Sequence, residues 1–79
     1  RSGLAELIAE IARQLVDEPD AVRVETEERD DAVVLLLRVA PGDIGKVIGR
    51  QGRLVRALRT VARAGGAHEG RRVLLEIAE

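Results

Sequence analysis

The 79-residue sequence contains no Phe, Tyr, Trp, Met or Cys, so a folded core must consist of Leu, Ile, Val and Ala. Without Cys, the chain forms no disulfide bond, thiolate metal site or cysteine nucleophile. Without aromatic rings, it lacks the stacking surface of RNA-recognition sheets, OB folds and cold-shock domains. Because a chain this short supports only one core, we expect a single domain over residues 1–79.

Composition also bears on the location of the protein. Hydrophobic residues are 46% of the chain and charged residues 34%, a balance typical of a folded soluble domain. No apolar run approaches the roughly 20 residues that cross a bilayer, and no secretory signal pattern is present. We expect a cytoplasmic protein that does not bind a membrane.

Charge is distributed unevenly along the chain. Residues 1–40 contain five Arg and ten Asp or Glu, whereas residues 41–79 contain eight basic and four acidic residues. Between Lys46 and Arg63 there are six basic residues and no acidic one. Such a local excess of positive charge favours binding to a polyanion.

Hydrophobic spacing in the first half predicts a helix followed by two strands. A helix over residues 3–16 is indicated by apolar residues at intervals of three and four. The alternating segment 22–27 and the apolar segment 32–39 predict a hairpin with its turn at 29–31, the second strand being the more central. The residues expected on the buried face of the helix are Leu4, Leu7, Ile8, Ile11 and Leu15.

The second half predicts two helices and a last strand. Asp43 is expected to cap a short helix over 43–48, in which Gly45 would allow close packing. Gly49 and Gly52 are expected to turn the chain into a second helix over 53–64, which has an aliphatic face and an arginine face. Gly65 and Gly66 are expected to end it. A strand over 71–77 follows, which gives the order helix, strand, strand, helix, helix, strand.

The segment Gly42-Asp43-Ile44-Gly45-Lys46-Val47-Ile48-Gly49-Arg50-Gln51-Gly52-Arg53, with Val55 three positions after Gly52, resembles the KH domain. The element order resembles the bacterial, type II form of this fold. The resemblance covers essentially the whole chain. It implies an α+β fold in which helices cover one face of a three-stranded sheet.

Residues 49–52 also have the properties of a phosphate-binding loop. Glycine has no Cβ, so a phosphate can approach the backbone closely, and the following helix directs its free N–H groups at the same anion. The resemblance implies that this loop binds the backbone of about four nucleotides of single-stranded RNA, while the bases lie in an apolar groove. The residues at and around the loop that would bind the RNA are Lys46, Gly49, Arg50, Gln51, Gly52, Arg53 and Arg56. The groove would be formed by Ile44, Val47, Ile48, Leu54 and Val55, with residues 35–39 opposite.

The residues give no support for an enzyme. Ser2 is the only serine and His68, expected in an exposed loop, the only histidine, and nothing forms a set of nucleophile and base. We expect no metal, cofactor or small-molecule substrate. A helix-turn-helix DNA-binding protein is the nearer alternative, because it also joins two helices by a turn that contains Gly. The predicted strands favour the KH fold.

A small aliphatic core also favours pairing between subunits, since it supplies little stability by itself. The resemblance implies self-association, or pairing with a second, larger KH-containing protein, in RNA regulation and cell-envelope growth. A second alternative is therefore a dimerisation module with incidental RNA affinity.

Overall fold

The computed structural model describes residues 3–78, with Arg50 and Gln51 described by their backbone alone. The described chain is α+β. Its elements follow the predicted order, except that a single bent helix stands in place of the two later helices. Two short 3-10 turns, η1 (Pro19–Ala21) and η2 (Pro41–Asp43), precede β1 and α2. The main elements are α1 (Gly3–Arg13), β1 (Arg23–Arg29), β2 (Ala32–Arg38), α2 (Ile44–His68) and β3 (Arg72–Ile77).

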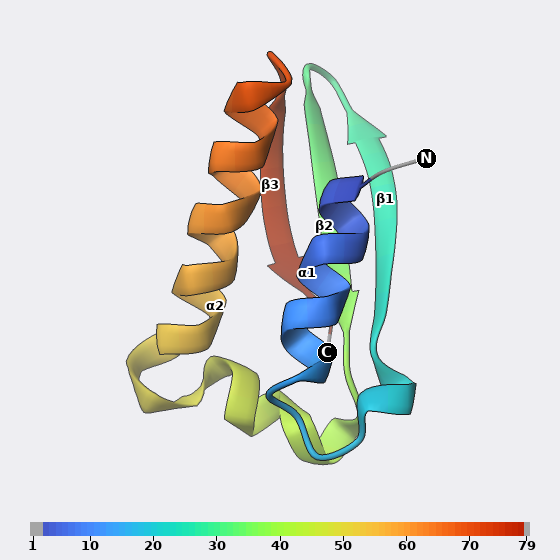
Figure 1. Cartoon of the computed structure of the whole chain (residues 1–79), viewed down its shortest axis with the longest axis vertical. Coiled ribbons are helices and arrows are strands. Elements are labelled where there is room, and N and C mark those ends of the chain that lie inside the picture. Colours follow the sequence, from blue (N-terminus) through green and yellow to red (C-terminus); the bar gives the residue numbers. More distant parts are fainter. Residues whose placement is uncertain (1–2, 79) are drawn as a thin grey trace.

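The three strands form one sheet in the order β1-β2-β3, and α1 and α2 pack against the same face of it (Figure 1). β1 and β2 are antiparallel and joined by a tight turn in which Asp30 has φ +47°, which confirms the hairpin. β3 is parallel to β2, because α2 crosses over the sheet between them. The type II KH arrangement predicted from the sequence is therefore confirmed.

The core lies between the sheet and the two helices. Alternate residues of β2 point toward the helices, because side chains along a strand alternate between the two faces of a sheet. Leu35 and Leu37 of β2 meet Ile8 of α1 and Leu58 of α2 there, and all four are almost completely buried. The described core contains aliphatic side chains alone, as the composition requires.

The predicted buried face of α1 is partly wrong. Leu7 and Leu15 remain 48% and 49% exposed, and regular helix ends at Arg13 instead of residue 16. The side chains that face the sheet are Ile8, Ala9 and Ala12. Two alanines bring the helix axis close to the strands, so the buried stripe is centred on small residues that a search for large apolar side chains overlooks.

Both helices predicted between residues 43 and 64 lie within α2. The chain leaves right-handed helical geometry at Gly52, where φ is +69°, and the ribbon bends sharply in this region (Figure 1). A side chain at this φ is strained, so glycine is required. The expected turn between two helical segments is thus a bend inside one span.

The prediction that Gly65 and Gly66 end the helix is wrong. Helix α2 continues to His68, and a Cβ at Gly65 or Gly66 would lie 2.7 Å from a Leu4 methyl or 2.6 Å from a Val73 methyl. These glycines permit close packing against α1 and β3. The chain turns away from the helix at Gly70, two residues after its end, where φ is +71°, and the N–H of Arg71 donates to the carbonyl of Gly66 at 2.7 Å.

Candidate functional site

An open groove of about 360 Å³ lies between the bend of α2 and the free edge of β3. Ile48 precedes the bend, and Val55 follows it. Ile48 is 39% exposed, high for an Ile in a helix that otherwise packs on a sheet, so the groove has an apolar wall open to solvent. The lining residues are Ile48, Val55, Arg59, Glu76 and Ile77.

The strand that borders this groove is β3, and the expectation that residues 35–39 face it is wrong. β2 is the central strand, and its Leu35 and Leu37 side chains are 2% and 0% exposed beneath the helices. β3 returns directly from α2 and pairs on the far side of β2 from β1. The edge strand is therefore the one that can be reached from α2.

Two of the predicted groove residues lie in the groove, and the others lie elsewhere. Ile48 and Val55 line it, whereas Val47 is 0% exposed and belongs to the core. Leu54 packs on the edge of the core, and Ile44 is half-buried near the start of α2. Positions 47 and 48 face different sides of the helix, so only one of them can face solvent.

The basic residues predicted to bind RNA also lie in different parts of the structure. Lys46 turns toward the segment after α1, where its Nζ lies 3.1 Å from Oδ1 of Asp17. Arg53 and Arg56 are exposed on α2 after the bend. The side chains of Arg50 and Gln51 lie outside the described part of the structure.

Asp43 holds the start of α2 in place, but not as the predicted cap. Its carboxylate accepts hydrogen bonds from the backbone N–H groups of Asp17 and Glu18, both at 3.0 Å, and makes no capping bond to its own helix. The residue is 1% exposed. The buried carboxylate therefore ties the segment after α1 to the segment of α2 that precedes the bend.

Gly45 and Gly49 lie in that same segment of α2, one turn apart. A Cβ at either position would meet nothing within 4 Å, so neither glycine is needed for packing. The expected packing role of Gly45 is wrong. At these two positions, no side chain covers the backbone of the helix at the surface.

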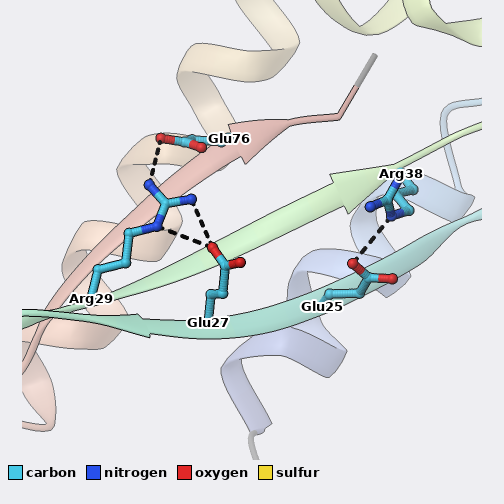
Figure 2. A network of polar contacts seen from close by, with 5 residues as sticks. All are labelled: Glu25, Glu27, Arg29, Arg38 and Glu76. Carbon is cyan, nitrogen blue, oxygen red and sulfur yellow. Dashed lines mark hydrogen bonds and ion pairs between the residues drawn. The ribbon is translucent and has the colours of Figure 1, made fainter.

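The single acidic residue among the described groove residues, Glu76, is held by an arginine. Figure 2 shows Arg29 of β1 between Glu27 of the same strand and Glu76 of β3, across the sheet face that carries no helix. The two distances are 2.7 Å to Glu27 and 3.7 Å to Glu76. The pKa of the Arg29 guanidinium is raised, mainly by its hydrogen bond with Glu27 and to a smaller extent by the negative charges of Glu27 and Glu76. Arginine is always charged in proteins, so Arg29 offsets the negative charge of Glu76 at the groove.

Arg59, Glu76 and Ile77 are groove residues that the sequence analysis did not identify. The Nε of Arg59 donates to the carbonyl oxygen of Leu75 at 3.3 Å, so this arginine lies against the free edge of β3. One signal was available, because the predicted strand 71–77 directly follows the basic helix and must return beside it. The apolar strand 32–39, expected to be central, could not also border an open groove.

Within residues 3–78, no cluster of three or more His, Cys, Asp or Glu side chains is arranged to bind a metal ion. None of the helices described has the length and apolar character needed to span a membrane.

Comparison with known proteins gives a consistent result. A family model described as "KhpA/KhpB, KH domain" matches residues 5–77. The RNA-binding protein KhpA of Aquifex aeolicus is 50% identical over 78 residues, which cover 99% of each chain. The protein of the same name from Bacillus subtilis is 46% identical over 74 residues, 94% of this chain and 91% of that one.

Solved structures agree at the level of the fold. The crystal structure of a point variant of Aquifex aeolicus Era bound to GDP.AlF4- superposes with a TM-score of 0.61 at 22% identity. A crystal structure of Era in complex with MgGDPNP and nucleotides 1506-1542 of 16S ribosomal RNA has the same score at 21% identity. The match covers 94% of this chain but 29% and 28% of the Era chains, and it concerns the fold alone. By its family model and its relatives, the chain belongs to the KhpA/KhpB family of KH-domain proteins.

Proposed function

We propose that this chain is a cytoplasmic protein that binds single-stranded RNA, with phosphates at the bend of α2 and bases in the groove beside β3. In this role it acts as an RNA chaperone or post-transcriptional regulator. The observation that carries the proposal is the pairing of an exposed apolar groove with adjacent helical backbone left bare at Gly45 and Gly49. The relatives named as RNA-binding proteins support the same ligand.

The chemistry of the site suits RNA in two ways. Ile48 and Ile77 offer aliphatic surface to the faces of bases, which replaces aromatic stacking in a chain without aromatic residues. Arg53 and Arg56 add positive charge beyond the bend, while Arg29 offsets the charge of Glu76. Binding by one short groove should be weak, electrostatic and only mildly selective for sequence.

The direct test replaces Arg50 and Gln51 by Asp together. Two carboxylates beside the bend repel phosphate, so RNA affinity should fall at least about ten-fold. Loop side chains contribute little to the core, so the thermal unfolding midpoint should change by only a few degrees. Titration with single-stranded RNA, followed by fluorescence anisotropy, measures the first effect, and circular dichroism measures the second.

Two outcomes would contradict the proposal. A folded double variant that binds RNA as tightly as the original protein would remove the bend from the binding site. Tighter binding of duplex DNA than of single-stranded RNA would favour the helix-turn-helix alternative, which inserts a helix into a groove of the duplex. The matched control is Arg13→Asp with Gln14→Asp, an Arg-Gln pair at the end of α1.

We also propose that the chain pairs with a second copy or with a KhpB-like protein. The supporting observation is the exposure of two large apolar side chains, Leu7 in α1 and Leu15 in the turn that follows it. An interface that covers them would add apolar burial to a small core. This pairing is compatible with RNA binding at the β3 edge.

A further inference from the structure

A second hollow lies at the opposite end of α2 from the bend, between the last turns of that helix and the start of β3. Its volume is about 650 Å³, and three arginines, Arg63, Arg71 and Arg72, line it. We call it the far hollow. Gly52 and Arg63 are separated by about 16 Å along the helix. Nothing in the RNA-binding site proposed above includes it.

The far hollow is continuous with the groove. A smaller hollow between them is lined by Arg59, Arg63 and Leu74, among others. It shares Arg59 with the groove and shares Arg63 and Leu74 with the far hollow. The three hollows therefore follow one another along the free edge of β3, from Ile77 to Arg72.

The charge of the far hollow suits an anion. Among the described residues, Arg63 and Arg72 have no acidic partner, whereas Arg71 pairs with Glu28 at 3.0 Å. Within the part of the chain that the structure describes, no acidic residue lines the far hollow or the smaller one. Asp30 and Asp31 line a neighbouring hollow, which shares Arg72 and Leu74 with the far hollow, so the positive surface ends beyond Arg72, at the hairpin.

Position decides which part of a ligand these arginines can reach. Charges act over about 8 Å at physiological salt, and Arg63 lies about twice that distance from the bend. Arg63 and Arg72 therefore have little effect on nucleotides held at the bend. They act on a strand that continues along β3.

We propose that the far hollow binds the phosphates of nucleotides that extend beyond the groove, with Arg63 and Arg72 as the contacts. The inference rests on the proposed RNA function and adds to it a second phosphate subsite. The bound strand is then longer than the roughly four nucleotides that one KH groove holds.

The test compares RNA lengths. Oligouridylates of about 4 and about 8 nucleotides are titrated against the original protein and against Arg63→Gln with Arg72→Gln. Each phosphate contact with a single strand contributes about 0.7 to the slope of log affinity against log salt. The double variant should lose about 1.4 from that slope for the longer RNA and keep the original affinity and slope for the shorter one.

A matched control removes the same charge elsewhere. Arg13→Gln with Arg23→Gln changes α1 and β1, on the opposite edge of the sheet from β3. This variant should bind the longer RNA with the original salt slope. An equal loss in both double variants would mean that net charge, not the far hollow, sets the affinity.

The remaining outcomes are also decisive. If the original protein bound both RNA lengths with equal affinity and equal salt slope, phosphate binding in the far hollow would be contradicted, and binding in the groove would not. Failure of the original protein to bind either RNA would instead contradict the proposed function, and this inference with it. An oligo-aspartate that binds at Arg63 and Arg72 as tightly as the longer RNA would identify an acidic protein segment as the occupant.

Discussion

Apart from Gly52, whose positive φ forms the bend, the glycines of α2 fall into two groups that the sequence does not distinguish. At Gly66 a Cβ would lie 2.6 Å from a Val73 methyl and 2.7 Å from the carbonyl oxygen of Arg71, which cannot move aside without shifting β3. At Gly45 and Gly49 a Cβ would meet open space. The first glycine serves packing, and the other two leave backbone accessible.

Alanine substitutions separate these roles. Gly49→Ala should keep the fold and raise the free energy of unfolding by up to about 1 kcal/mol, because Ala favours a helix over Gly. RNA affinity should nevertheless fall several-fold, since the new methyl would obstruct the close approach of phosphate that we propose at this position. Gly66→Ala should lower the free energy of unfolding by about 1 to 3 kcal/mol through overpacking. Urea unfolding and an RNA titration measure both effects, and unchanged RNA affinity of Gly49→Ala would speak against close approach at this position.

At the scale of elements, the orientation of the segment before the bend depends on contacts between distant parts of the chain. Asp43 accepts two backbone N–H groups from residues 17 and 18, and Lys46 pairs with Asp17. The amphipathic pattern of α2 contains no information about these partners. Asp after Pro-Gly suggests a helix cap, and the structure uses the same carboxylate to connect two loops.

Removing this connection should cost stability. Asp43→Ala leaves two backbone N–H groups without an acceptor, so the free energy of unfolding should fall by about 2 to 4 kcal/mol. Asp43→Asn keeps one acceptor and should lose less. The control Asp17→Asn removes only the exposed pair with Lys46 and should change stability by less than about 1 kcal/mol. Urea denaturation measures all three, and equal stability of Asp43→Ala and Asp17→Asn would show that the two hydrogen bonds contribute nothing.

At the scale of the whole molecule, we expect only one surface to form the interface of a pair, and the free face of the sheet to take no part in it. The exposed side chains of Leu7 and Leu15 should lie in the interface of a pair. Leu7→Lys with Leu15→Lys should therefore convert a dimer into a monomer in sedimentation equilibrium, because burying a charge costs several kcal/mol. Leu74→Lys, on the other face of the sheet, is the control and should remain dimeric. Dissociation by Leu74→Lys would contradict this interface, and a monomeric original protein would contradict pairing between two copies of the chain.

Local patterns in the sequence determined the elements, the hairpin, the aliphatic core and the bend at Gly52, because each depends on residues a few positions apart. Of the helical residues that the family resemblance placed in the groove, Ile48 and Val55 line it. Tertiary structure alone decided which strand borders the groove, that Leu7 and Leu15 stay exposed, and which glycines pack. These features depend on the parallel pairing of β3 with β2 and on the approach of α1 to the sheet, contacts between segments far apart in the chain. Hydrophobic periodicity identifies the face that an element buries, but the partner that covers that face is set only when the whole chain packs.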